Sequence, residues 1–238
     1  MTPEQAAHET REAIVRGTGR FMMDPEAYAH GQSLGFEGMD FYLGGRAGVL
    51  GDVPGDVAAA ALVFFAPDTV CAMWERAGAV MSRAQAAQAW ADWGYTWARA
   101  HFDADLDWAR LADLLGRIFT TAPVAGAPLF AGWRLLPAPD DPRARTIHGM
   151  NALRELRGAL HGAAVLTVGL TPHEASSVRT PQMGAAFGWP EAVVDTAPLN
   201  ERWSLAEART DRMLGRHFGV LEEHERKELV EMLGATLS

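Results

Sequence analysis

The sequence predicts an all-α protein built as a multi-helix bundle. Apolar residues recur with helical spacing along most of the chain, and no run of alternating β-branched residues predicts a strand. Expected helix starts carry capping signals, as in Thr2-Pro3-Glu4 and Asp24-Pro25-Glu26. With 238 residues, the chain is long enough to bury a core without disulfides or metals.

The expected helices follow one another with short connections. They occupy residues 3–15, a segment starting at 25, and residues 56–65, 67–75, 82–101, 105–119, 141–168, 172–178, 190–196, 204–218 and 221–235. The glycine-dense stretch FYLGGRAGVLGDVPGD predicts a loop, and the Pro/Gly-rich residues 122–138 with the following PAPDDP predict a linker. The linker divides the chain into residues 1–138 and 139–238, which form two parts or one compact unit.

Composition excludes several classes of protein. The single cysteine, Cys71, allows no internal disulfide and no cysteine zinc cage. The N-terminus lacks a signal-peptide pattern, and no apolar run is long enough to span a bilayer, so we expect a cytoplasmic protein without a membrane partner. The formal net charge is -9, with no basic run to replace phosphate counterions. Nucleic acid is therefore a disfavoured partner.

Residues 151–165, NALRELRGALHGAAV, thread charged side chains through a helix rich in small residues. At about 100° per residue, Arg154, Arg157 and His161 share one narrow stripe. Gly158 and Gly162 lie beside that stripe. Because glycine weakens a helix by about 0.5–1 kcal/mol relative to alanine, this pair suggests that another group approaches the backbone there. The alternatives are a solvated helix face or the wall of a cleft.

In a cleft, these residues have distinct roles. The two guanidiniums could hold a carboxylate or phosphate through paired hydrogen bonds, and Glu155 could orient a neighbouring arginine. His161 would be the proton-transfer group, since adjacent cations lower its pKa and favour the neutral imidazole.

Two segments carry a resemblance to a known family. The chain is similar to a group of actinobacterial helix-turn-helix proteins of largely unassigned function, whose motif is approximately L-R-E-H-R-G-D-G-H-x-A-A. The residues that match this motif are Arg154, Glu155, Arg157, Gly158 and His161. The second match, FYLGGRAGVLGDV, aligns Tyr42, Arg46, Leu50 and Gly51 with the family's tyrosine–arginine–glycine segment. Weaker similarities include Gly188-Trp189 and Glu207-x-x-Thr210-Asp211.

The resemblance implies a C-terminal helix-turn-helix-like part, but this chain departs from the family in one respect. Family members have a short winged segment before the final Glu…Thr-Asp helix. Here only DTAPLNERWS occupies that place, which is too short for a clear wing. With a negatively charged chain, the helix-turn-helix pattern then predicts a shape more than DNA binding.

Other chemical features carry weaker predictions. Asp103, Asp105 and Asp107 lack the glycine and glutamate of an EF-hand loop, so a helix N-cap is favoured over a metal site. The row Trp90, Trp93 and Trp97 is typical of core packing, with an apolar cavity as the alternative. Cys71 is expected to be a buried, unreactive thiol.

The sequence thus predicts a site for a small anionic or polar molecule between the glycine-dense segment and the 151–165 helix. Arg46, Tyr42, Arg154 and Arg157 are the candidate binding residues, and His161 and Glu155 are the candidate catalytic residues. No motif specifies a cofactor or a metal, and whether the protein is an enzyme is left open. The alternatives are a helix-turn-helix transcriptional regulator and a non-catalytic interaction protein whose charged helix forms a homo-oligomer interface.

Overall fold

One long central helix organises the molecule. The computed structural model describes residues 1–102, 105–191, 193 and 195–237, and in these ranges it contains twelve α-helices and no strand. The helices are α1 (Pro3–Met22), α2 (Pro25–Ser33), α3 (Asp40–Ala47), α4 (Gly55–Ala61), α5 (Pro67–Val80), α6 (Arg83–His101), α7 (Trp108–Thr121), α8 (Pro128–Leu135), α9 (Pro142–Thr167), α10 (Pro172–Arg179), α11 (Asn200–Phe218) and α12 (Glu223–Ala235). Short 3-10 turns lie at Gly48–Leu50, Pro181–Met183 and Ala197–Leu199. The all-α prediction is confirmed.

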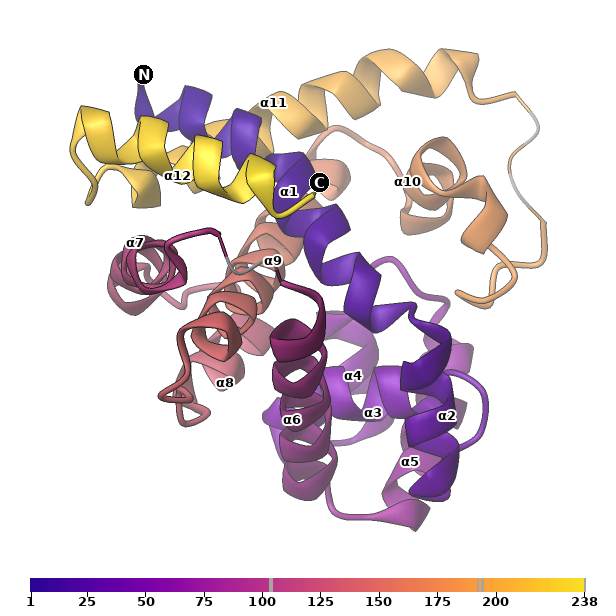
Figure 1. The fold of residues 1–238 in the computed structure, drawn as a ribbon. Helices are drawn as coiled ribbons and strands as arrows, with labels where there is room; N and C mark the ends of the chain where they lie inside the picture. Colours follow the sequence, from indigo (N-terminus) through magenta and orange to yellow (C-terminus); the bar gives the residue numbers. More distant parts are fainter. Residues whose placement is uncertain (103–104, 192, 194, 238) are drawn as a thin grey trace.

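Helix α9 runs through the middle and contacts α1, α6, α7, α8 and α11 (Figure 1). It begins where Asp141 accepts a hydrogen bond from the Ala144 N–H and Pro142 occupies the first turn, and it ends before Gly169, whose φ is +75°. Because neighbours surround it, α9 buries polar as well as apolar side chains. These include His148, Asn151, Glu155, Arg157 and His161.

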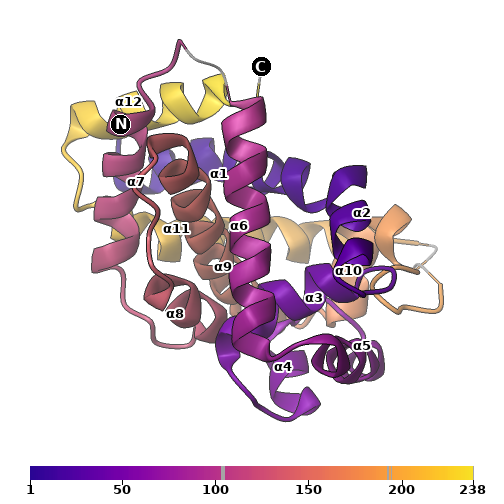
Figure 2. The same ribbon diagram turned by 60° about the horizontal axis from the view of Figure 1, so that its bottom comes forward.

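The N-terminal and C-terminal helices pack together against α9. Helix α1 lies antiparallel to α11, so that His8 meets Asp211 and Arg11 meets Glu207. Helix α12 lies beside α1 and contacts α7 (Figures 1 and 2). The main hydrophobic core therefore draws side chains from Ala6 to Leu233, on both sides of the expected division at residues 138 and 139.

Two expected irregular segments are helical. The glycine-dense segment contains α3, because its glycines allow close packing: a β-carbon on Gly44 would lie 2.6 Å from the Ala77 Cβ, and one on Gly45 would lie 2.4 Å from the Trp90 Cβ. The predicted loop at Arg46 is therefore wrong. The segment 122–138 contains α8, which starts at Pro128 and buries Leu129 and Trp133. The linker is thus limited to the few residues between α8 and α9.

Other boundaries also differ from expectation. The helix predicted at 190–196 is wrong for the residues described there, although residues 192 and 194 lie outside the described part. Helix α4 ends at Ala61 instead of continuing to residue 65, and a turn closed by the Phe65 N–H and the Leu62 carbonyl follows it. We call residues 62–65 the cavity turn. Residues 195–204 form a 3-10 turn and the start of α11, so they contain no wing.

Candidate binding site

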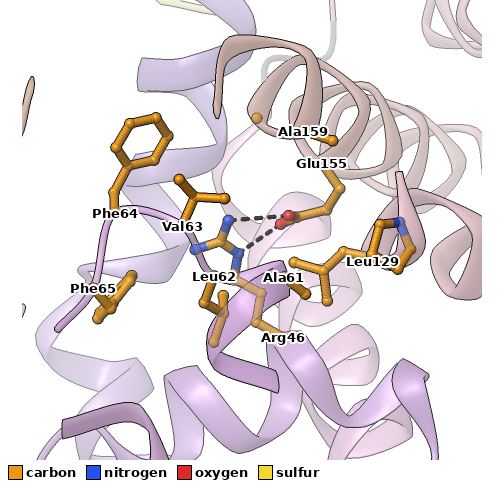
Figure 3. A pocket seen from close by; sticks show the side chains of 11 residues that line it. Arg46, Ala61, Leu62, Val63, Phe64, Phe65, Leu129, Glu155 and Ala159 are labelled. Carbon is orange, nitrogen blue, oxygen red and sulfur yellow. Dashed lines mark hydrogen bonds and ion pairs between the residues drawn. The ribbon is translucent and has the colours of Figure 1, made fainter. Parts of the chain in front are cut away.

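Arg46 of α3 and Glu155 of α9 form a buried ion pair. The Arg46 Nε donates to Glu155 Oε1 at 2.6 Å, and Nη2 donates to Oε2 at 3.0 Å. The two side chains are 12% and 1% exposed. This two-bond geometry fixes the guanidinium in one plane against the central helix (Figure 3).

Tyr42 and Arg154 complete the charged group. Arg46 Nη1 donates to the Tyr42 hydroxyl at 2.7 Å, and Arg154 Nη1 donates to Glu155 Oε1 at 3.3 Å. Burial raises the pKa of Tyr42, but the two guanidiniums outweigh it and hold that pKa below its usual value. Burial lowers the pKa of Arg46, while Glu155 more than offsets this effect and raises it. Two cations and one carboxylate therefore meet here, and the buried Nε of Arg154 has no hydrogen-bond partner.

A small cavity of about 30 Å³ lies beside this charged group. This volume is enough for about one or two water molecules. Its lining comprises Arg46, Ala61, Leu62, Val63, Phe64, Phe65, Pro128, Leu129, Glu155, Gly158 and Ala159 (Figure 3). The charged side chains form one wall, and the cavity turn and Leu129 supply an apolar one.

The cavity turn also has two backbone donors that no described residue uses. None of the hydrogen bonds among the described residues uses the backbone N–H of Val63 or Phe64, which are the two central residues of the turn. Both residues are half-buried and line the cavity. Unpaired backbone donors beside a guanidinium are a combination that suits an anion.

The two glycines of the charged helix have different environments. A β-carbon on Gly162 would lie 3.0 Å from the Val63 Cγ2, so the cavity turn does approach the α9 backbone there, as predicted. A β-carbon on Gly158 would meet no atom within 4 Å, because Gly158 faces the cavity. Gly158 therefore leaves space in the cavity that a side chain would fill. Gly162 allows Val63 of the cavity turn to pack against α9.

Arg157 and His161 do not face Arg46. Arg157 Nη2 donates to Glu207 Oε2 of α11 at 2.5 Å, and Arg11 of α1 donates to the same oxygen at 3.0 Å. His161 Nδ1 lies 2.9 Å from the Thr210 hydroxyl oxygen, also on α11. The stripe read from the sequence is thus divided: Arg154 bonds to Glu155, the partner of Arg46 on α3, while Arg157 and His161 contact α11.

Burial decides between the two interpretations of this helix. Arg157 is 7% exposed and His161 is 4% exposed, so a solvated face is wrong for both. The same burial removes them from any subunit interface in this conformation.

The environment of His161 is apolar on its ring faces. Its ring centroid lies 5.5 Å from that of Phe64 and 4.9 Å from that of Trp203. Burial lowers the pKa of His161 to about 4, with Glu207 opposing and Arg157 assisting this shift. The neighbouring cations therefore act in the predicted direction, but burial is the larger cause. Because Phe64 also lines the cavity, His161 lies behind the cavity wall.

Several residues of these clusters carried too weak a sequence signal to be predicted. Glu207 and Thr210 were noted only within a weaker similarity, and Arg11 gave no signal because an arginine in a first helix is common. His148 and Asn151 are each 2% exposed on α9, and His148 Nδ1 lies 2.8 Å from the Tyr95 hydroxyl. Asn151 lies one helical turn before Glu155 and His148 lies two turns before it, and this spacing could have indicated a polar row on that face.

The remaining candidates have structural roles. Asp107 caps α7 by accepting from the Arg110 N–H, which confirms the predicted N-cap, while Asp103 lies outside the described residues. Trp90 and Trp97 are buried against Phe21, which confirms core packing. Cys71 is half-buried instead of buried, with its sulfur 3.6 Å from Asp56 Oδ1.

Two kinds of feature are absent from the described ranges. No group of three or more histidine, cysteine or carboxylate side chains is placed to hold a metal ion. None of the helices there has the length and apolar character needed to cross a membrane.

Comparison with known proteins relates the chain to one family. Neither the curated proteins nor the solved structures contain a match to it. A family profile described as the helix-turn-helix family matches residues 6–238, which is nearly the whole chain. This match agrees with the resemblance carried by the α3 and α9 motifs. The chain belongs to the helix-turn-helix family.

Proposed function

We propose that the protein binds a small organic anion in the cavity between α3, the cavity turn and α9. The observation that carries this proposal is a cavity lined by the Arg46 guanidinium, by Gly158, and by Val63 and Phe64, whose backbone N–H groups have no partner among the described residues. Tyr42, Arg154 and Glu155 hold that guanidinium in place. These residues also belong to the two motifs through which the chain resembles actinobacterial members of the family.

The charge balance favours an anion over a cation. Arg46 and Arg154 face a single carboxylate, Glu155, so the group carries one excess positive charge when Tyr42 is neutral. An anion that accepts from the Val63 and Phe64 N–H groups would compensate this charge. The apolar side chains of Leu62, Phe65 and Leu129 suit a short hydrocarbon group. A short-chain monocarboxylate combines both properties.

Binding, not turnover, is the function proposed. His161 lies behind Phe64 and is not among the residues that line the cavity. A role for His161 in proton transfer would require Phe64 to move. Arg157 is engaged by Glu207, so it joins the anion site only if that ion pair opens.

Propionate is a suitable probe, with propylammonium as the control of opposite charge. We expect propionate to raise the melting temperature of the wild-type protein by mass action on the folded state, and propylammonium to leave it unchanged. Gly158→Leu should abolish the response, because the new side chain occupies the cavity. Gly234→Leu is the matched control, since Gly234 of α12 also has no atom within 4 Å of a built β-carbon. A wild-type response that persists in Gly158→Leu would contradict the assigned site.

A second candidate function is transcriptional regulation, which family membership favours. Helix α11 adds a structural reason: Arg209, Arg212 and Arg216 are exposed on one side of it, at spacings of three and four residues. Such a row could contact DNA phosphates despite the negative net charge. Replacing Arg212 and Arg216 by Glu should then weaken retardation of genomic DNA fragments and reduce its salt dependence, whereas Lys227→Glu on α12 should change neither. Absence of salt-dependent retardation by the wild-type protein would remove this candidate.

A further inference from the structure

The cavity turn joins two separate hydrophobic cores. Leu62 and Phe65 belong to the main core. Phe64, between them, packs against a smaller C-terminal core. That core is formed by Ala164, Val165, Leu170, Ala175, Leu199 and Ala206, from α9, α10, the last 3-10 turn and α11. The cavity therefore lies at the seam between the two cores.

The outer side of the cavity turn is held by the segment that follows α10. The Ala66 N–H donates to the Phe187 carbonyl at 2.8 Å, and Trp189 Nε1 donates to the Phe64 carbonyl at 3.0 Å. The rings of Phe65 and Phe187 lie with centroids 4.3 Å apart. Two hydrogen bonds and one ring contact thus join residues 64–66 to residues 187–189.

This segment is in turn attached to α10. The ring of Trp189 stacks on that of His173, with centroids 4.9 Å apart. The Val193 N–H donates to the Ser177 hydroxyl at 3.0 Å. A displacement of the cavity turn can therefore reach α10 through side-chain and backbone contacts alone.

The size of the cavity favours such a displacement. A volume of about 30 Å³ holds about one or two waters, so enclosing a carboxylate of several heavy atoms there requires a wall to move. The wall formed by α3 is tightly packed, because Gly45 lies against Trp90 and the Arg46 carbonyl accepts a hydrogen bond from Trp133 Nε1. The turn cannot move toward α9, where Val63 already lies against Gly162. Its other neighbours are Phe187 and Trp189, which contact Phe65 and the Phe64 carbonyl.

We propose that filling the cavity displaces the cavity turn and thereby repositions α10 and the segment after it, so that ligand occupancy is coupled to the C-terminal part of the protein. This inference rests on the proposed function for the identity of the ligand, but the coupling itself follows from the contacts of the turn. Because α11 contributes to the smaller core, the coupling extends to the element that carries the exposed arginines.

The test uses Gly158→Leu, whose new side chain should occupy the cavity in place of the ligand. Hydrogen exchange followed by NMR would report on the Trp189 indole N–H and the Ala66 amide, with the indole signal assigned by Trp189→Phe. We expect both to exchange about 10-fold faster or more in Gly158→Leu. The indoles of Trp74 and Trp133, which donate to Val53 and Arg46 carbonyls, should exchange as in the wild type. Gly234→Leu should match the wild type at all four positions, and Gly158→Val replaces Gly158→Leu if the latter does not fold.

A propionate titration separates this inference from the proposed function. Propionate added to the wild-type protein should accelerate exchange of the same two groups. If Gly158→Leu abolishes propionate binding but leaves Trp189 and Ala66 unchanged, the coupling is wrong and the binding site stands. If Gly158→Leu accelerates both groups while propionate does not bind the wild-type protein, the coupling stands and the proposed ligand class is wrong.

Discussion

Arg46 and Glu155 are 109 residues apart in the chain and form a two-bond ion pair in the protein interior. The pair joins α3 to the central helix and sets the position of the cavity beside it. Both partners were selected from the sequence, but their direct pairing was not. Because the pair is buried, substitutions of its members should change the free energy of unfolding by a measurable amount.

Breaking the Arg46–Glu155 pair from one side should be strongly destabilising. Arg46→Met leaves a carboxylate that is 1% exposed facing Arg154 alone, and such a loss typically lowers the free energy of unfolding by about 3–5 kcal/mol. The double variant Arg46→Met/Glu155→Leu removes both charges and should lose less. Urea denaturation of the single and double variants measures the difference. If the double variant loses as much free energy of unfolding as Arg46→Met and Glu155→Leu lose together, the pair has no coupling energy.

The Glu207 carboxylate should be equally sensitive. Glu207 accepts from Arg157 and Arg11, so Glu207→Gln removes the carboxylate charge bonded to the buried Arg157 guanidinium and should lower the free energy of unfolding by about 2–4 kcal/mol. Glu12→Gln is the control, because Glu12 pairs with Arg16 on the surface, and it should give no detectable change. Equal effects of the two substitutions in urea denaturation would contradict the assigned role of burial.

Alanine substitutions at two glycines should have opposite signs. Gly158→Ala faces open space in a helix, so it should raise the free energy of unfolding by about 0.5–1 kcal/mol through helix propensity. Gly45→Ala would place its β-carbon 2.4 Å from the Trp90 Cβ and should destabilise the protein by more than about 1 kcal/mol, because neither backbone can yield easily. Thermal unfolding of both variants checks this. If Gly45→Ala is neutral, α3 does not pack closely on α6.

The buried histidines should make the protein less stable in acid. Burial lowers the pKa of His148 and of His161 to about 4, from an ordinary value near 6.5. Between these values the unfolded state binds more protons than the folded state, so stability is lost as the pH falls from 6.5 to 4. Each histidine contributes about 3 kcal/mol over this range. In urea titrations, His161→Gln should reduce the slope of stability against pH, and an unchanged slope would show that the pKa of His161 is the same in the folded and unfolded states.

Local sequence patterns predicted most of the helices, with α3 and α8 as the exceptions. Their periodicity and capping residues placed the central helix at 141–168, against Pro142–Thr167 in the structure, because the Asp141-Pro142 start and the Gly169 stop act locally. The same local signals placed the helix of residues 83–101 after its Ser82 cap. Charge and composition also predicted which partners are disfavoured, since those properties do not depend on folding.

The tertiary structure decided which neighbour each interior charge meets. Arg154, Arg157 and His161 share one stripe of α9, yet Arg154 pairs toward Glu155 at the α3 side, while Arg157 and His161 meet α11. Likewise, Gly44 and Gly45 suggested a loop, although they lie in a helix that packs closely on α5 and α6. Helical spacing specifies which residues share a face. The identity of the group opposite that face depends on contacts between segments distant in the chain, which no local pattern encodes.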